Sequence, residues 1–297
     1  MRLVLFDDYR PGLLVDDQVV DVSEVVEAGR SADGQALMER IIRDFATLAP
    51  DLGRQAASGL RRPLVSVRLR PPLPRPPKIL CLIGNYREGV DRPPRAIDMF
   101  VKASSAVIGP GDTIELPEAP ARVFQHEAEL AVVIGRDARS VPRDAAMRHV
   151  FGYTTMVDVS ARGLGREGAA SFIGKSCATF APLGPAIVTA DEVADPHALG
   201  VHYWVNGALR QDYSTGDMEH RIPELIEWAS ASVGLQLGDV IACGTNHQGL
   251  GPLQDGDLGE IEIEGVGRMT MRVHDPYQRS WPREIDQEVA RRLRGGP

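Results

Sequence analysis

The chain is organised around one stretch near its middle, Phe124-Gln125-His126-Glu127-Ala128-Glu129-Leu130-Ala131-Val132-Val133-Ile134-Gly135. Successive side chains of a β-strand alternate between its two faces, so Glu127 and Glu129 share one face with small apolar residues. The opposite face is apolar throughout. The pattern therefore predicts that residues 127–134 form a strand with both faces buried.

The paired glutamates of this strand raise an electrostatic question. Side chains two residues apart on a strand lie roughly 5 to 7 Å apart, so two buried carboxylates repel each other and lose hydration. Protonation, pairing with Arg or Lys, or a divalent cation would relieve this. We favour a cation, since Mg²⁺ takes oxygen ligands and Glu127 and Glu129 supply two. Glu-x-Glu also occurs on solvated strands, so the pattern alone does not assign a metal.

Length, composition and charge restrict the class of protein. The chain has 297 residues, of which 43% are hydrophobic, which is enough for one large domain or for a small and a large one. A net charge of -8 argues against a nucleic-acid partner. No stretch of about 20 apolar residues and no signal-peptide pattern is found, so we expect a cytoplasmic protein with no membrane partner. The three scattered cysteines indicate buried free thiols.

The distribution of prolines and apolar runs predicts four parts. Residues 1–70 combine a hairpin with a helix over 35–48 that Pro50 would end, which indicates a small N-terminal α/β domain. Residues 71–77 form a Pro-rich linker. Residues 78–281 contain many short apolar runs, which indicates a β-rich domain with one clear helix at about 221–233. Residues 282–297 are charged and are expected to form a surface tail.

Two residues after the central strand could add to an acidic site. Asp158 follows an apolar strand and is either a cap for the next turn or a third metal ligand, with Arg162 as its expected ion-pair partner. Lys175 lies in a Gly-Lys-Ser triplet, but Ala169 replaces a required glycine of a phosphate loop, so we reject that motif. Lys175, one of only three lysines, either binds an anionic substrate or is a surface residue.

A glycine-rich loop follows a later strand, at residues 243–252. Such loops bring backbone N–H groups near a ligand carboxylate, although a plain turn is the simpler explanation. His247 in this loop is either an acid or base or a structural residue. His126 lies beside the acidic pair, but its side chain is expected to point away from Glu127 and Glu129.

Taken together, these segments resemble the fumarylacetoacetate hydrolase superfamily over residues 78–281. The resemblance rests on four motifs in family order: the Asn85-Tyr86 loop after a strand, the Glu127-x-Glu129 strand, Asp158 in Asp-Val-Ser-Ala-Arg followed by Lys175, and Thr245 before Gly-Pro-Leu-Gln-Asp-Gly-Asp. The resemblance implies an α+β fold that is mainly β, a mixed β-sandwich roll, and a homodimer.

The same resemblance implies a site and a substrate class. Mg²⁺, with Mn²⁺ or Ca²⁺ as alternatives, would be held by Glu127, Glu129 and Asp158. Lys175 would add positive charge at the substrate oxygens, and the other implied substrate-binding residues are Asn85, Tyr86, Lys102 and Thr245. The substrate would be a small 2-oxo, β-diketo or enol acid.

One departure concerns the base. Hydrolytic relatives usually carry His and Glu at the positions of Gly89 and Arg92, so the usual water-activating pair is missing. We hypothesise that His247 replaces it, with Glu88 and Asp91 as weaker candidates.

Four functions remain open at this point. The leading hypothesis is a Mg²⁺-dependent enzyme that cleaves a carbon–carbon bond by hydrolysis or decarboxylation, through an enolate stabilised by the metal. An isomerase or tautomerase at the same site needs no activated water. A third mechanism makes Lys175 a Schiff-base nucleophile without metal. A fourth is a weakly active or inactive member that binds a metal and an oxo acid.

Overall fold

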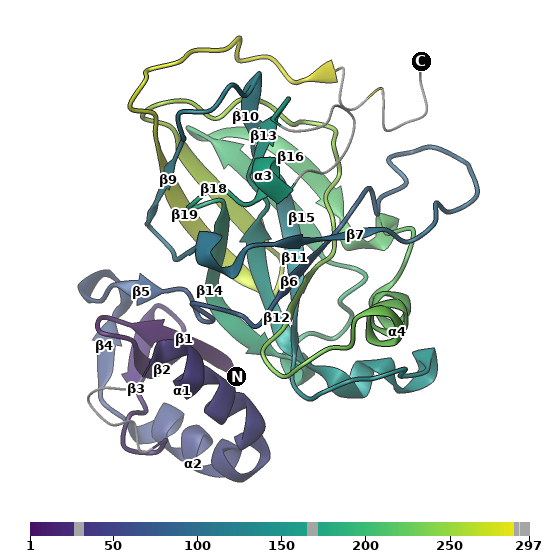
Figure 1. Ribbon diagram of the computed structural model, residues 1–297. Helices are drawn as coiled ribbons and strands as arrows, with labels where there is room; N and C mark the ends of the chain where they lie inside the picture. The colour runs from purple at the N-terminus through teal and green to yellow at the C-terminus, as the bar shows by residue number, and fades with distance from the viewer. Residues whose placement is uncertain (27–32, 165–171, 288–290, 292–297) are drawn as a thin grey trace.

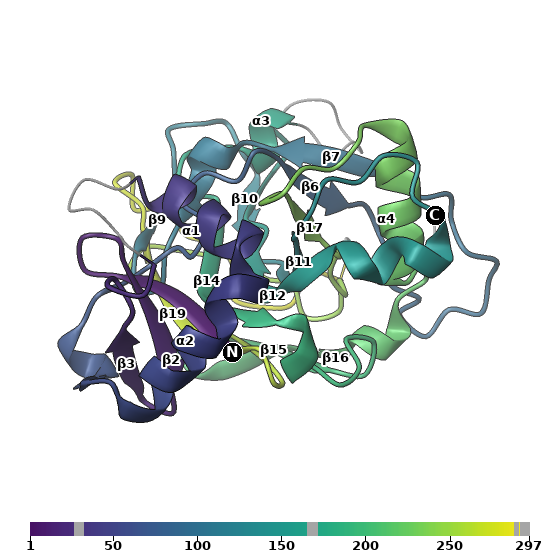
Figure 2. The same ribbon diagram turned by 90° about the horizontal axis from the view of Figure 1, so that it is seen from below.

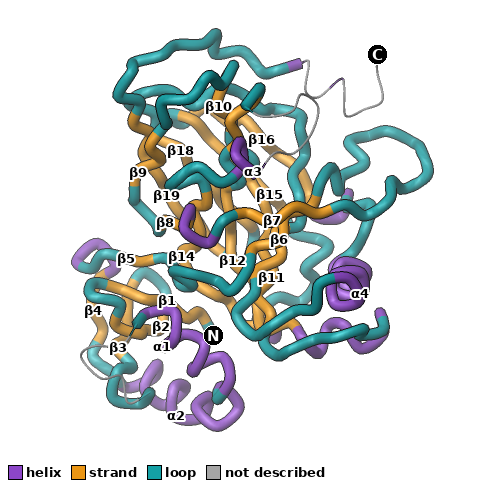
Figure 3. The backbone as a smooth tube through the Cα atoms, viewed as in Figure 1, coloured by secondary structure: helices purple, strands orange, loops and turns teal. Residues whose placement is uncertain are grey.

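The computed structural model describes residues 1–26, 33–164, 172–287 and 291 of the chain. Strands dominate and helices are few and short (Figure 3), so the predicted α+β fold that is mainly β is confirmed. Two sheets carry most of the structure, and neither closes into a barrel.

The largest sheet has twelve strands and runs through both halves of the chain. Along its path the strands are β4 (Arg61–Pro63), β3 (Gln18–Asp21), β2 (Arg10–Val15), β1 (Arg2–Phe6), β14 (Ala181–Thr189), β12 (Val150–Val157), β11 (Ala128–Ile134), β17 (Val240–Ala242), β6 (Ile79–Leu82) and β7 (Met99–Lys102). Off this path, β5 (Leu69–Arg70) pairs with β1, and β8 (Val107–Ile108) pairs with β14.

The N-terminal strands join this sheet through one antiparallel contact. Arg2 and Leu3 of β1 pair with Val188 and Ile187 of β14. Helices α1 (Gly34–Arg43) and α2 (Phe45–Ser58) lie over the N-terminal strands (Figures 1 and 2). Residues 1–70 therefore extend the sheet of the larger part, and the domain boundary at 71–77 stays a prediction.

The predicted helix end at Pro50 is wrong. Helix α1 ends before Asp44, and a second helix, α2, runs from Phe45 through Pro50 to Ser58. Proline removes one backbone hydrogen bond from a helix interior. Two residues later Leu52 is fully buried, so packing holds α2 together despite the proline.

The remaining strands form a second layer. The five-stranded sheet runs β16 (Ala208–Ser214), β15 (Gly200–Val205), β18 (Leu258–Ile263), β19 (Gly267–His274) and β9 (Thr113–Glu115), and a short pair joins β10 (Val123–Gln125) to β13 (Ser160–Arg162). The other helical segments are α3 (Phe172–Lys175), α4 (Ile222–Ser232) and the 3₁₀ turns η1 (Leu64–Ser66), η2 (Ser104–Ala106), η3 (Arg143–His149), η4 (Ala190–Glu192) and η5 (Thr215–Asp217). Helix α4 has the predicted extent, with Pro223 in its first turn and Gly234 at φ +69 after its end.

Strand β11 lies in the middle of the large sheet and is buried on both faces, as predicted. Leu130 and Val132 contribute to the core between the two sheets, whereas Ala131 and Val133 face the core shared with the N-terminal helices. Because β12 and β17 flank β11, the residues that enter and leave these three strands meet at one end of the sheet.

The predicted surface tail covers residues 282–297, of which 288–290 and 292–297 lie outside the described residues. No helix in the described ranges is long and apolar enough to cross a membrane.

Candidate metal centre and active site

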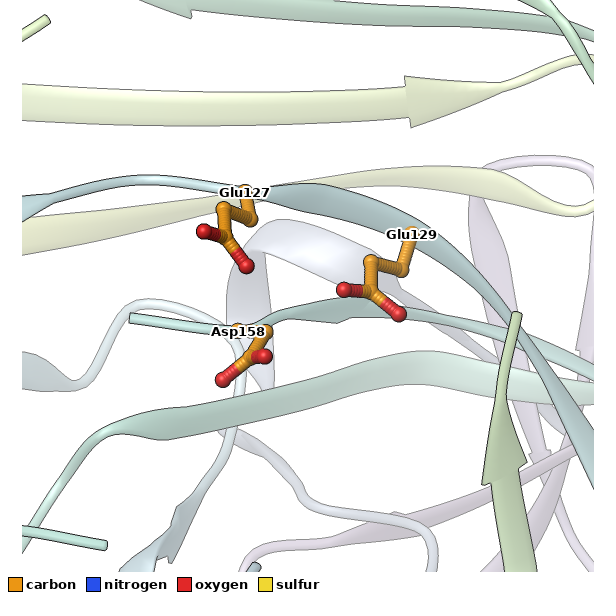
Figure 4. A group of neighbouring side chains, drawn as sticks. All are labelled: Glu127, Glu129 and Asp158. Atoms are coloured by element: carbon orange, nitrogen blue, oxygen red, sulfur yellow. The ribbon is translucent and has the colours of Figure 1, made fainter. Parts of the chain in front are cut away.

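Three carboxylates meet at this end of the large sheet. Glu127 precedes β11, Glu129 lies in it, and Asp158 directly follows β12. One ligand oxygen from each lies within 4.8 Å of the others, and all three residues are buried. Figure 4 shows the two glutamates side by side with their carboxylates directed toward Asp158. The Asp158 N–H donates to the Glu127 carbonyl over 2.8 Å, so backbone pairing sets their spacing.

Cations surround this carboxylate triad. Lys175 Nζ donates to Glu127 Oε2 over 2.6 Å and to Asp158 Oδ2 over 2.8 Å. Arg162 donates to Glu127 Oε1, not to Asp158, so the predicted Asp158–Arg162 pair is wrong. The Asp158 carboxylate accepts no backbone N–H among the described residues, and a capping role is therefore not supported.

The charges within the triad are unequally compensated. Burial opposes ionisation of Glu127, but Lys175 and Arg162 outweigh it and hold its pKa well below the usual range. For Glu129, burial and the charges of Asp158 and Glu127 raise the pKa well above the usual range. Within the described part of the chain, Glu129 accepts one backbone hydrogen bond, from Gly244 N–H at 2.8 Å. Glu129 is thus the carboxylate that most needs a further positive charge.

The residues present fit a hard divalent cation. Asp158 Oδ1 accepts no hydrogen bond from any described residue, because Lys102 Nζ lies 2.8 Å away but donates to the carbonyls of Val159, Lys175 and Phe180. This oxygen lacks a hydrogen-bond donor but is ion-paired with Lys102. Together the three buried carboxylates form an oxygen-only donor set, which Mg²⁺ and Mn²⁺ prefer.

A histidine–glutamate pair lies close to the triad. His247 Nδ1 is 2.6 Å from Glu88 Oε1, and the same oxygen accepts the His247 N–H over 3.0 Å. Both residues are buried, and a positive charge on His247 would help to lower the pKa of Glu127, after burial and the two cations named above. An ionised Glu88 is an acceptor only, so Nδ1 of a neutral His247 carries the proton. No described residue binds Nε2, which can therefore act as a base.

The two positions where the sequence departs from the family pattern have other surroundings. Arg92 forms an ion pair with Glu219, which also binds Arg95 over 3.1 Å. Gly89 has φ +76, a conformation that favours glycine. The ion pairs with Glu219 anchor the loop that carries Glu88. The sequence predicts His247 and Glu88 only as alternative bases. It does not predict their contact, because 159 residues separate them and no spacing rule links them.

The implied substrate-binding residues are engaged with the protein. Asn85 donates to the carbonyls of His220 and Cys243 and accepts the His220 N–H. Tyr86 is fully buried and packs edge to face on Tyr213 at 4.9 Å. Lys102 is fully buried in its cage of carbonyls, and the Thr245 hydroxyl accepts from Gln211 over 2.8 Å. Their role as substrate contacts stays a prediction.

Two of the three thiols and the histidine of the central stretch agree with expectation. Cys81 and Cys243 are buried free thiols, and Cys177 is partly buried. His126 faces away from the triad and stacks on Tyr203 at 4.2 Å. Burial lowers the pKa of His126 to about 4, so its ring is neutral at neutral pH. The polar residues Gln211 and Tyr213, which contact this region, carry no sequence signal that would have identified them.

The fold and the site can now be compared with known proteins. The model of the fumarylacetoacetate (FAA) hydrolase C-terminal family matches residues 78–274 of the chain. The structure of maleylpyruvate hydrolase from Sphingobium sp. SYK-6, in complex with manganese (II) ion and pyruvate, is 38% identical, with a TM-score of 0.85. The superposition covers 93% of this chain and 99% of that one.

Other relatives carry different reaction names. The mitochondrial oxaloacetate tautomerase FAHD2B of Bos taurus is 39% identical over 253 residues, which is 81% of this chain and 77% of the relative. The 2-hydroxyhepta-2,4-diene-1,7-dioate isomerase from Mycobacterium marinum is 38% identical with a TM-score of 0.67, covering 74% of this chain and 82% of that one.

Proposed function

Because the chain belongs to the fumarylacetoacetate hydrolase family, whose matched relatives are enzymes, we propose that it is a Mg²⁺-dependent hydrolase of a carbon–carbon bond in a small 2-oxo acid. The observation that carries the proposal is the contact between His247 Nδ1 and Glu88 Oε1 at 2.6 Å. Hydrolysis was in doubt from the sequence because the usual His and Glu are replaced by Gly89 and Arg92. A histidine–glutamate pair from other positions supplies the same chemistry.

In this proposal, Glu127, Glu129 and Asp158 hold the metal. When bound, the metal would act as a Lewis acid on the carbonyl and carboxylate oxygens of the substrate. The manganese (II) complex of a 38% identical structure supports a divalent metal for this chain, and Mg²⁺ is our choice because all the donors of the triad are oxygens.

Lys175 supplies fixed positive charge next to the metal. Burial disfavours its charged form, but Asp158 and Glu127 raise the pKa of Lys175 above the usual range. A cationic Lys175 is a poor Schiff-base nucleophile and a good partner for negative charge that develops on substrate oxygens. Arg162, 23% exposed, and Lys102 are further cations at the triad, where they pair with Glu127 and Asp158.

The base acts on water. His247 Nε2 takes a proton from water, and the water oxygen attacks the second carbonyl of the substrate, which is the acyl carbonyl of an acylpyruvate. The carbon–carbon bond then breaks, and its electron pair stays on the carbon next to the 2-oxo group. His247 returns the proton to that carbon, so the products are a 2-oxo acid and a carboxylic acid. Glu88 keeps the proton on Nδ1 and stabilises the charged ring.

A tautomerase is the second candidate, and the 39% identity to an oxaloacetate tautomerase favours it. The same His247 would move a proton between carbon and oxygen of the 2-oxo acid, without attack by water.

NMR of the reaction in D₂O with Mg²⁺ tests both candidates. With an acylpyruvate, a hydrolase gives pyruvate and the free acid, whereas a tautomerase only exchanges deuterium into the substrate or speeds the keto–enol conversion of oxaloacetate. If the metal-loaded protein forms neither the cleavage products nor deuterated substrate, both candidate functions are contradicted. The homodimer and the cytoplasmic location stay predictions.

A further inference from the structure

The residue between the two glutamates, Ala128, is held by side chains from the other sheet. Its N–H donates to Gln211 Oε1 over 3.1 Å, and its carbonyl accepts from the hydroxyl of Tyr213. Gln211 and Tyr213 are two residues apart on β16, so their side chains project from the same face of that strand.

On the side of β11 that faces β17, no described strand pairs with the backbone of Ala128. Glu127 uses its carbonyl to bind β12, through Asp158 N–H, so the backbone groups of Ala128 point the opposite way, toward β17. Two residues further on, the Leu130 carbonyl accepts from Cys243 N–H over 2.9 Å. β17 ends at Ala242, and the chain then leaves the sheet as the loop with His247. Gln211 and Tyr213 take the place of the missing strand.

The other end of Gln211 holds that loop. Its Nε2 donates to Thr245 Oγ1 over 2.8 Å and to the Asn246 carbonyl over 2.6 Å. His247 is the next residue. A carbonyl can only accept and an N–H can only donate, so Asn246 and Ala128 together fix which end of the amide is nitrogen.

His126 completes the arrangement. Its Nδ1 lies 3.0 Å from Gln211 Oε1, and as that oxygen only accepts, Nδ1 carries the proton. Gln211 is fully buried, and its two donors and two acceptor positions are all used. A buried amide with all its hydrogen bonds formed has one orientation, so it holds Ala128 and the His247 loop at a fixed separation.

We propose that Gln211 is a positioning residue that sets the distance between the glutamate pair and His247. Tyr213 and His126 assist it, the first by holding Ala128 and the second by orienting the amide. The inference rests on the proposed function in one respect, that His247 is the base. It predicts that a substitution can remove the hydrogen bonds of Nε2 to the His247 loop and leave those of Oε1 to Ala128 and His126 in place.

Gln211→Glu tests the loop end. The substitution removes both donors toward Thr245 and Asn246 and keeps the oxygen that faces Ala128 and His126. We expect kcat to fall at least about tenfold for whichever reaction the wild type performs, while the Kd for Mn²⁺ changes less than about threefold. Gln35→Glu is the matched control, a buried glutamine in α1 that binds Glu39 and Arg75, and should leave both values unchanged.

An NMR measurement makes the test independent of turnover. Bound Mn²⁺ broadens nearby nuclei according to distance, so in protein with ¹³C-labelled histidine the His247 ring signal, assigned from His247→Gln, should broaden in the wild type. In Gln211→Glu it should broaden less. This result stands or fails even if no substrate is found, so it separates the inference from the proposed reaction.

Two outcomes would overturn the proposal. One is equal broadening of His247 in the wild type and Gln211→Glu. The other is a joint fall of turnover, Mn²⁺ affinity and Tm, as a general packing role predicts. If Gln211→Glu does not fold, the uncharged Gln211→Met is compared in the same way, with the fall in kcat expected to exceed the loss of Mn²⁺ affinity.

Discussion

His247 and Glu88 share a hydrogen bond of 2.6 Å between Nδ1 and Oε1, although they come from loops at opposite ends of the catalytic region of the sequence. Glu88 Oε2 is buried without a partner among the described side chains, so the carboxylate is held for His247 alone. We expect Glu88→Gln to lower kcat about ten- to a hundredfold with little change in KM, because the amide no longer stabilises a protonated ring. Steady-state kinetics checks this.

The control for that substitution is Glu118→Gln. Glu118 is exposed and accepts a hydrogen bond from the hydroxyl of Tyr277 over 2.8 Å. It should leave kcat unchanged. A Glu88→Gln enzyme as active as the wild type would remove the histidine–glutamate pair from the mechanism.

Removal of a metal ligand should separate metal binding from folding. Glu129 carries a pKa raised by burial and by its acidic neighbours, so Glu129→Gln should not destabilise the metal-free protein. Mg²⁺ at about 100 times its Kd should add about 2.7 kcal/mol to the unfolding free energy of the wild type and nothing to that of the variant. Thermal unfolding with Mg²⁺ and with a chelator measures both. Equal stabilisation of wild type and variant would place the metal elsewhere.

Lys175 distinguishes charge stabilisation from covalent catalysis. Since Asp158 and Glu127 outweigh burial and raise the pKa of Lys175, the amine stays protonated at neutral pH. We expect Lys175→Met to lower kcat about a hundredfold or more. Borohydride in the presence of substrate should leave the wild-type mass unchanged, as mass spectrometry would show. A trapped adduct on Lys175 would instead support the Schiff-base mechanism.

His126 makes stability depend on pH. Burial lowers its pKa from 6.5 to about 4, so the unfolded chain takes up the proton first as the pH falls. The stabilisation is present above the unfolded pKa of about 6.5 and is lost as the pH falls toward the folded value, by about 2 kcal/mol between pH 7 and pH 5. Urea unfolding at the two values should show this loss in the wild type and a smaller one in His126→Asn. An equal loss in both would assign the effect to other groups.

Regular patterns in the sequence predicted the strands and the glutamate pair of the acidic triad. Alternation of apolar residues revealed β11 with both faces buried, and its two glutamates lie where that alternation puts them. The approach of Asp158 followed only from family resemblance, since the pairing of β11 with β12 is not a local property. Three contacts join segments that are distant in the sequence, so no spacing could reveal them. They are the hydrogen bond of Glu88 with His247, the hydrogen bonds of Gln211 and the ion pair of Arg162 with Glu127.

The pairing of β1 with β14 has a consequence for how the chain can be divided. Val188 and Ile187 would expose unpaired backbone groups if the first seventy residues were cut away, and an open apolar strand edge invites pairing with another molecule. The N-terminal segment thus covers this edge of β14 and prevents it from pairing with another molecule. A shortened protein starting at Lys78 would carry every catalytic group proposed above and still be prone to aggregate.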